Sequence, residues 1–176
     1  MIKDEIITAA EKIFFAFTIY CNSIDEVVFF DKPTAKWSIA ENVQHLIIAT
    51  NTATIAYKLP KFLVRFVGGK PNRTSKNYEE LVAKYKAKLV TGGVASGRFV
   101  PKPITIQLGK ERLMANWGKV TTKHLKAIIK NNTENDLDNY LVKHPLLGRI
   151  TLRELCYFTI YHTEHHLTII SLRSVT

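Results

Sequence analysis

Apolar residues recur at intervals of three and four along much of the chain, as they do on the buried face of an α-helix. Over residues 2–22 the positions with this spacing are Ile6, Ala9, Ala10, Ile13, Phe14, Phe17 and Tyr20. The same period runs through residues 38–57, 108–130 and 151–173. The pattern therefore predicts four helices of about 20 residues each.

Polar residues mark where several of these helices begin. Residues 38–41 (SIAE) and 151–154 (TLRE) each place a hydroxyl three positions before a glutamate, which is the sequence of a capping box. Asn77 and Glu80 have the same spacing and open a shorter amphipathic helix that runs through about residue 90. Pro60 lies late in the second helical pattern and predicts a kink or an end there.

The segments between the helices show little alternation of apolar and polar residues. Residues 67–76 are typical of a loop, residues 91–103 of an extended connection rich in glycine and proline, and residues 144–148 (HPLLG) of a turn. Residues 99–106 are the one candidate strand. We therefore predict an all-α fold, an antiparallel four-helix bundle with a long crossover that carries one extra short helix. We expect residues 1–176 to form a single domain.

The composition is typical of a folded protein, with 46% apolar and 23% charged residues. The sequence predicts no membrane span, because no stretch of about 18 apolar residues is free of charge. The first residues, MIKDEII, are acidic where a signal peptide needs positive charge, and we expect a soluble, cytoplasmic protein. Cys21 and Cys156 lie within apolar helical patterns, which favours small buried side chains over a disulfide or a catalytic thiol.

Basic residues are concentrated in the middle of the chain. Residues 58–130 contain 17 Lys and Arg against three acids, a net charge of +14, whereas the whole chain carries +10. Such asymmetry indicates either a solvated lysine-rich face or a surface that attracts an anionic partner such as nucleic acid. The segment has no zinc-finger spacing, basic heptad helix or aromatic RNA-binding consensus, so both interpretations stay open.

Two histidines, His162 and His166, are four residues apart in the last predicted helix. Residues at this spacing lie on one face of a helix, so two imidazoles can converge on one metal ion. His45 lies among the apolar positions of the second long helix and supplies a third candidate ligand. Three neutral imidazoles with an open position are the ligand set of a catalytic zinc site.

This spacing does not distinguish a metal site from three histidines packed in the core of a metal-free bundle. It does exclude the HExxH arrangement of metalloproteases, because Thr163 follows His162 and Glu164 points away from the face that His162 and His166 share. The sequence therefore predicts no protease-type carboxylate base on this helix.

Two segments carry a more specific pattern. Residues 37–46 (WSIAENVQHL) place a Trp-Ser-Ile entry before the histidine of the second long helix. Residues 144–166 run from a His-Pro…Gly turn into a final helix that contains YHTEHH. In order, spacing and helix placement these segments resemble the DinB-like (YfiT-type) superfamily, and the order of the helices is consistent with it over the whole chain.

The resemblance implies a four-helix bundle with a long crossover, usually a homodimer. It also implies that His45, His162 and His166 bind a divalent metal ion, zinc or nickel, with water in the remaining positions. Better-understood members are thiol S-transferases that use low-molecular-weight thiols such as bacillithiol or mycothiol, and others are described as metal-dependent hydrolases. We accordingly expect a small-molecule thiol or electrophile as the partner. The basic stretch over residues 58–130 lies where members of the family vary most.

For the remaining histidines we expect structural roles. We expect His165 to lie beside the histidine pair, His124 to be structural and His144 to order the turn before the last helix. Tyr161 is a candidate for a hydroxyl in the pocket. The cations that could hold an anionic group of a substrate are Arg98, Lys102 and Arg112, which nothing in the sequence places near the histidines.

Overall fold

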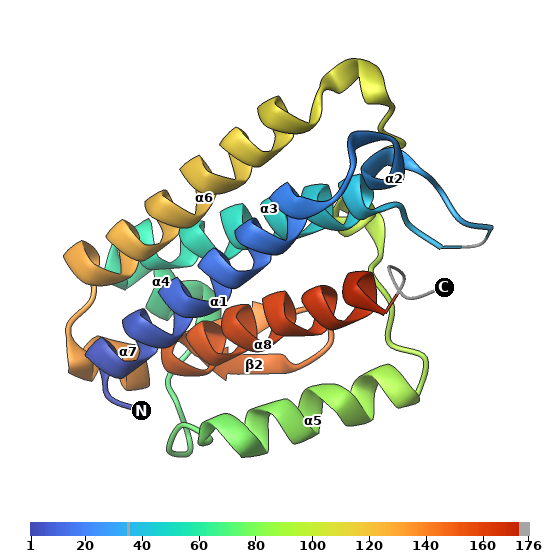
Figure 1. The fold of residues 1–176 in the computed structure, drawn as a ribbon. Coiled ribbons are helices and arrows are strands. Elements are labelled where there is room, and N and C mark those ends of the chain that lie inside the picture. The colour runs from blue at the N-terminus through green and yellow to red at the C-terminus, as the bar shows by residue number, and fades with distance from the viewer. Residues whose placement is uncertain (35, 173–176) are drawn as a thin grey trace.

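Long helices dominate the computed structural model, which describes residues 1–34 and 36–172 (Figure 1). The four long helices are α1 (Lys3–Ser23), α3 (Ile39–Lys58), α6 (Lys110–Asn131) and α8 (Leu152–Ser171). They contain 21, 20, 22 and 20 residues, so the four helices predicted from the apolar period are confirmed. The predicted end of the last helix at Arg173 lies outside the described residues.

Shorter helices fill the connections: α2 (Glu26–Phe30), α4 (Lys61–Gly68), α5 (Tyr78–Val90), α7 (Glu134–Asn139), and the 3-10 turns η1 (Gly97–Phe99) and η2 (Ile106–Leu108). The crossover from α3 to α6 thus carries α4 as well as the predicted α5. The predicted break at Pro60 is confirmed, but this proline also stands at the N-cap of α4. A proline is tolerated at the start of a helix, so the chain resumes a helix directly after the break.

The segment before α8 corrects the prediction of a simple turn. β1 (Leu141–His144) and β2 (Gly148–Thr151) form an antiparallel hairpin around that turn. Each strand has four residues, too few to show an alternating pattern in the sequence. The strand considered for residues 99–106 is wrong, because this segment contributes to η1 and η2 instead.

Both predicted capping boxes are present at the long helices. Ser38 Oγ accepts the backbone N–H of Glu41 at 3.0 Å, and Glu41 Oε2 accepts that of Ser38 at 2.8 Å. Thr151 Oγ1 accepts the backbone N–H of Glu154 at 3.2 Å, and Glu154 Oε2 accepts that of Thr151 at 2.9 Å. The caps therefore fix the starting points of α3 and α8, the two helices that carry the candidate metal ligands.

The four long helices pack around an apolar core. α3 contacts both α6 and α8, α1 contacts the same two helices, and α5 lies against α8 on the outside of the bundle (Figure 1). The buried ring of Trp117 has its centre 5.5 Å from that of Phe14 and 5.3 Å from that of Phe17. Its Nε1 donates to Thr18 Oγ1 at 3.0 Å, so the polar edge of this side chain is also satisfied. These contacts join α6 to α1, and α3 and α8 contact each other directly.

The structure also bears on two exclusions drawn from the sequence. No helix among the described residues has the length and apolar character needed to cross a membrane. Cys21 and Cys156 are buried and form no disulfide, which confirms the prediction for them. Burial raises the pKa of each thiol to about 12, so neither is a thiolate nucleophile near neutral pH.

Candidate metal centre

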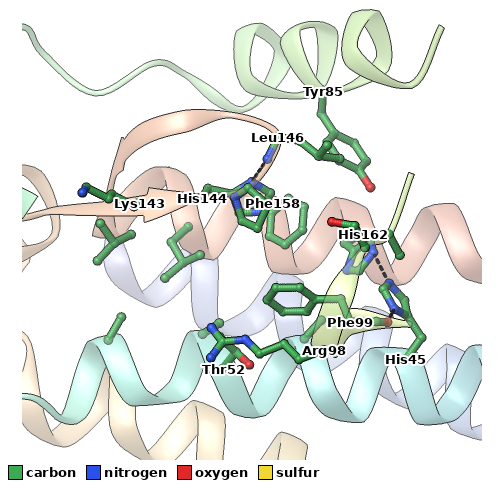
Figure 2. A pocket seen from close by; sticks show the side chains of 18 of the residues that line it. His45, Thr52, Tyr85, Arg98, Phe99, Lys143, His144, Leu146, Phe158 and His162 are labelled. Atoms are coloured by element: carbon green, nitrogen blue, oxygen red, sulfur yellow. Dashed lines mark hydrogen bonds between the residues drawn. The ribbon is translucent and has the colours of Figure 1, made fainter. Parts of the chain in front are cut away.

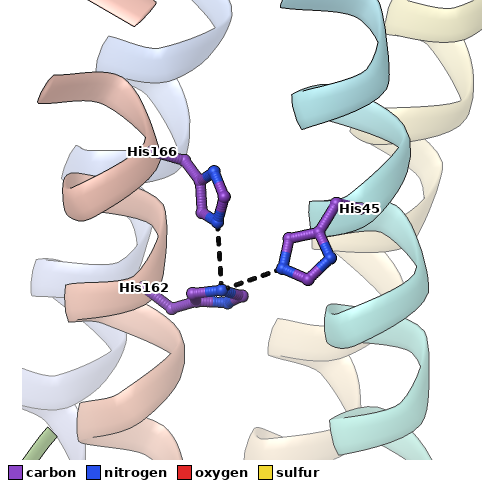
Figure 3. A group of neighbouring side chains, drawn as sticks. All are labelled: His45, His162 and His166. Carbon is purple, nitrogen blue, oxygen red and sulfur yellow. Dashed lines mark hydrogen bonds between the residues drawn. The ribbon is translucent and has the colours of Figure 1, made fainter. Parts of the chain in front are cut away.

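Three histidines converge between two neighbouring helices. His45 lies on α3, and His162 and His166 lie one turn apart on α8. Figure 3 shows the three rings facing one another between these helices. His162 Nε2 lies 3.1 Å from His45 Nε2 and 3.2 Å from His166 Nε2. The structure therefore brings the three predicted ligand residues together, and all three are buried.

Hydrogen bonds on the far side of two rings determine which nitrogen carries the proton. His45 Nδ1 lies 2.7 Å from the carbonyl oxygen of Phe99, and His166 Nδ1 lies 2.7 Å from Asn42 Oδ1. The Asn42 amide is oriented by its Nδ2, which donates to the carbonyl oxygen of Ser38 at 2.8 Å. Both acceptors are oxygens without a hydrogen, so Nδ1 is the protonated nitrogen of each ring. Both Nε2 atoms therefore present lone pairs to the centre of the cluster.

The cluster holds more lone pairs than protons to satisfy them. His162 Nε2 donates one hydrogen at most, so it cannot satisfy both His45 Nε2 and His166 Nε2. A cation between the rings can accept all three lone pairs. Nitrogen ligands at about 2.0–2.1 Å from a tetrahedral zinc ion lie about 3.3 Å from one another, close to the two separations observed here. The donor set and its geometry therefore fit a divalent metal ion.

Burial keeps the three rings uncharged. Removal from water lowers the pKa of His45, and it lowers the pKa values of His162 and His166 well below their ordinary range. Neighbouring histidines lower the latter two pKa values further, because adjacent imidazolium charges would repel each other. Neutral imidazole is the form that binds a metal, so the cluster is in the right protonation state near neutral pH.

Aromatic rings enclose the cluster. The centre of the Trp37 ring lies 5.0 Å from that of His45, and the same indole is parallel to the His166 ring within 5° at 6.4 Å. Phe158 stacks on His162 with ring centres 4.8 Å apart. These apolar walls lower the local dielectric and so strengthen the attraction between an ion and its ligands.

A cavity of about 350 Å³ opens beside the cluster. Figure 2 shows His45 and His162 at one end of it, with Tyr85 and Phe99 close by. Much of the apolar wall comes from α3, the β-hairpin and α8: Ala49, Ala53, Ala56, Val142, Leu146, Leu155 and Phe158. Val94 and Ala95, which precede η1, and Phe99 of η1 complete it. No Asp or Glu is among the described residues that line the cavity. A small molecule bound here thus meets two of the three histidines and no carboxylate.

The comparison with protein families agrees with this geometry. The family model described as the DinB superfamily matches residues 17–170. The chain belongs to the DinB superfamily. The matched range includes all three histidines of the cluster, and the helical fold that the resemblance implies is confirmed. No curated protein and no solved structure matches the chain. The comparisons therefore identify the family of this DinB protein but indicate no substrate for it.

The other three histidines lie outside the cluster. His165 is half-buried on α8 beside the pair, as predicted. His124 is 1% exposed, its Nδ1 lies 2.9 Å from Thr54 Oγ1, and burial lowers its pKa to about 4, so it is a neutral structural residue as expected. His144 Nδ1 accepts two backbone N–H bonds from the following turn at 3.2 Å each, which confirms its ordering role. His144 also lines the cavity.

The residues proposed from the sequence for substrate binding divide into two groups. Arg98 lines the cavity. Lys102, Arg112 and Tyr161 are not among its lining residues, so for them the expectation is not met. Tyr161 packs instead against Lys86, whose Nζ lies 5.5 Å from the centre of its ring.

Several residues around the site are not identified by the sequence pattern. Asn42 precedes His45 by three residues and therefore shares its face of α3, which is a signal that could have found it. Phe99 contributes a backbone carbonyl, which every residue has, so no side-chain pattern could reveal its role. Lys143 lines the cavity from a hairpin that the sequence pattern does not show.

Proposed function

We propose that this protein is a metal-dependent enzyme in which His45, His162 and His166 hold a divalent ion, zinc or nickel, for thiol transfer to a small electrophile. One observation carries the proposal: hydrogen bonds to Phe99 O and Asn42 Oδ1 aim two imidazole lone pairs at the third ring. Membership of the DinB superfamily supports it. Three neutral histidine ligands do not neutralise the charge of a divalent ion. The ion can therefore polarise a group that binds to it, as in a catalytic site.

When bound, such an ion supplies Lewis acidity that lowers the pKa of a coordinated thiol or water. Water is the harder nucleophile to form, and metal-dependent hydrolases often use a carboxylate base to take its proton. No Asp or Glu among the described residues lines this cavity. A thiol ionises at a dication without such a base. Because a free thiol has a much lower pKa than water, it depends less on such a base, and this lining favours thiol transfer over hydrolysis.

The residues around the cluster have separate tasks in this reaction. Asn42 and Phe99 orient two of the rings, while Trp37 and Phe158 keep water away from them. Tyr85 lines the cavity, and burial raises the pKa of its phenol to about 12. The phenol is therefore protonated at neutral pH and can donate a hydrogen bond to an electrophile as negative charge develops on it.

Metal analysis of protein purified without a metal-affinity tag tests this proposal, followed by an assay of thiol consumption. We expect about one zinc or nickel ion per chain. The loaded protein should accelerate the reaction of 2-mercaptoethanol with monochlorobimane, and a chelator should abolish this reaction and lower Tm. Metal binding with ester hydrolysis but no thiol consumption would favour the reaction with water. No metal uptake after reconstitution would identify the histidines as core residues of a metal-free bundle.

The hydrogen bond from His166 to Asn42 gives a prediction for a residue that does not bind the ion itself. Asn42→Ala is expected to lower metal affinity about 10- to 100-fold, because His166 loses the acceptor that fixes its tautomer and orientation. Asn51→Ala, on the same helix but outside the cluster, is the matched control and should bind metal as the unmodified protein does. Competition with a coloured chelator measures both affinities. Equal metal affinities of the two variants would show that Asn42 has no role in metal binding.

A groove lined by lysines supports a second candidate function, the binding of nucleic acid. Its basic residues come from the end of α3 and from one face of α6: Lys58, Lys119, Lys123, Lys126 and Lys130. No Asp or Glu is among the described residues that line this groove. Like charges three or four residues apart destabilise a helix, and the phosphates of a nucleic acid would remove that repulsion.

For this second function we expect the protein to bind a fluorescently labelled DNA duplex, with an affinity that falls steeply between about 50 and 200 mM salt. Binding should be lost when three lysines of α6 are replaced by glutamine, namely Lys119, Lys123 and Lys126. The charge-matched control replaces three exposed lysines outside the groove, namely Lys12, Lys36 and Lys88. Equal losses in both triple variants, or binding that is insensitive to salt, would exclude the groove as a specific site. Loss of the histidine cluster should leave DNA binding intact.

A further inference from the structure

The charged residues that line the cavity beside the histidine cluster are all of one sign. Arg98 and Lys143 are its cationic residues, and the described lining residues include no Asp or Glu to balance them. No salt bridge among the described residues pairs Arg98 or Lys143 with a carboxylate. The cavity therefore offers positive charge to whatever it binds.

The guanidinium group of Arg98 lies away from the cluster of His45, His162 and His166. Figure 2 shows Arg98 extending from the end where His45 lies toward Thr52, and Lys143 on the hairpin with its nitrogen pointing away from the other labelled side chains. Thr52 follows His45 by seven residues on α3. At 1.5 Å per residue this is about 10 Å along the helix axis. The cavity thus has a histidine end and a cationic end, separated by roughly the length of a short alkyl chain.

The wall between these two ends is apolar. Ala49, Ala53 and Ala56 are spaced three or four residues apart along α3, so these small side chains face the cavity in one row. Leu155 and Phe158 of α8 line it as well. Such a row of alanines binds a hydrocarbon segment, while the hydroxyl groups of Thr52 and Ser96 also line the cavity.

A pair of like charges lies on the exposed face of the hairpin, and Arg149 is not among the residues that line the cavity. Lys143 of β1 lies directly opposite Arg149 of β2 in the register of the hairpin, and both side chains are exposed. Like charges directly opposite each other destabilise an antiparallel pair. No salt bridge within the described part of the chain neutralises either of them. Val142 and His144, the neighbours of Lys143 in β1, line the cavity, so strand alternation directs the Lys143 side chain to the opposite face, and Arg98 is the cation that extends along the cavity.

We infer that the substrate is an elongated amphipathic anion, with its reacting group at the histidine cluster, an apolar body along α3, and a carboxylate or similar anionic group held by Arg98. This substrate class rests on the proposed function, in which the cluster is the reacting end. Guanidinium and ammonium groups form charge-assisted hydrogen bonds with carboxylates, which are stronger than bonds between neutral groups. Arg98 would therefore determine which thiols or electrophiles enter in the productive orientation.

The position of Arg98 also connects substrate binding to the metal ligands. Arg98 and Phe99 are consecutive in η1, and the Phe99 carbonyl is the acceptor that fixes the tautomer of His45. An anion that holds Arg98 in place therefore also restrains the turn that orients His45. Arg98 is a binding and positioning residue in this account.

A pair of thiols that differ at the far end tests the substrate class. We expect zinc-loaded protein to bind 6-mercaptohexanoate roughly 10-fold more tightly than 6-mercaptohexanol in calorimetric titrations, because a charged hydrogen bond is gained. Arg98→Met should reduce this preference, and the zinc content of each variant is measured alongside the titration. Lys102→Met is the matched control, since Lys102 belongs to the same basic stretch but does not line the cavity, and it should keep the preference.

The outcomes separate this inference from the proposed function. Equal zinc-dependent affinities for the two thiols would overturn the anionic substrate class and leave the metal site standing. Protein that takes up neither zinc nor nickel would overturn the proposed function. In that case heptanoate, which lacks the thiol, is titrated into the metal-free protein. Binding that is lost in Arg98→Met would support the cationic end, and equal binding by the Arg98→Met and Lys102→Met variants would overturn it.

Discussion

Replacing His162 by alanine is expected to lower the affinity for zinc or nickel by more than about 100-fold, beyond the range for residues that only orient a ligand. His162 Nε2 is the central atom of the cluster, since it lies within 3.2 Å of both other Nε2 atoms. Without it, His45 and His166 retain two ligand atoms from different helices. Metal content and calorimetric titration measure the loss, and thiol consumption should fall with it.

His165→Ala is the matched control for this variant. His165 lies on the same helix three residues from His162, yet it is not part of the candidate metal-binding group. Its replacement should leave metal content unchanged and should alter Tm only slightly, because its side chain is half-exposed. Equal metal content in the two variants would show that the cluster does not bind the ion.

Replacing Glu154 by glutamine is expected to destabilise the protein by about 3 kcal/mol. The buried Glu154 carboxylate accepts two bonds from the Arg73 guanidinium at 2.6 and 2.9 Å, and backbone N–H bonds from Lys76 at 2.7 Å and Thr151 at 2.9 Å. It therefore holds the loop before α5 against the start of α8. Because the Arg73 side chain is 35% exposed, the loss should lie at the lower end of the range for broken buried ion pairs.

Urea unfolding at neutral pH measures this effect, and Tm should fall by roughly 6–12 °C. Glu164→Gln on the same helix is the control, because Glu164 is exposed and its loss should cost no more than about 0.5 kcal/mol. Similar losses in the two variants would contradict a structural role for the buried carboxylate.

The Glu154 carboxylate also makes the stability of the protein depend on pH, in a direction that its pKa shift determines. Burial by itself would raise the pKa of Glu154, but hydrogen bonds from Arg73, Lys76 and Thr151 outweigh it and hold the pKa below its ordinary value of 4.5. The stability that Glu154 contributes is therefore fully present above pH 4.5 and is lost as the pH falls through the folded-state pKa. The difference in unfolding free energy between the unmodified protein and Glu154→Gln should accordingly narrow on acidification below pH 4.5.

Local pattern was sufficient for the long helices and for part of the site. The period of three and four predicted α1, α3, α6 and α8, because burial of one helix face leaves a mark on residues close in sequence. The caps at Ser38 and Thr151 were predictable for the same reason, since hydroxyl and amide are three residues apart. The pairing of His162 with His166 is also local, and His45 was added by its position on a second inward-facing helix.

Only the tertiary structure decided how the site is completed. The acceptor for His45 is a carbonyl 54 residues away, and the acceptor for His166 is an amide 124 residues away. Arg98 lines the cavity while Lys102 and Arg112 of the same basic stretch do not. The hairpin that brings Lys143 to the cavity is too short to leave an alternating pattern. The periodicity of a helix encodes which of its faces is buried, whereas the loop or strand that covers that face is determined by the packing of all the elements together.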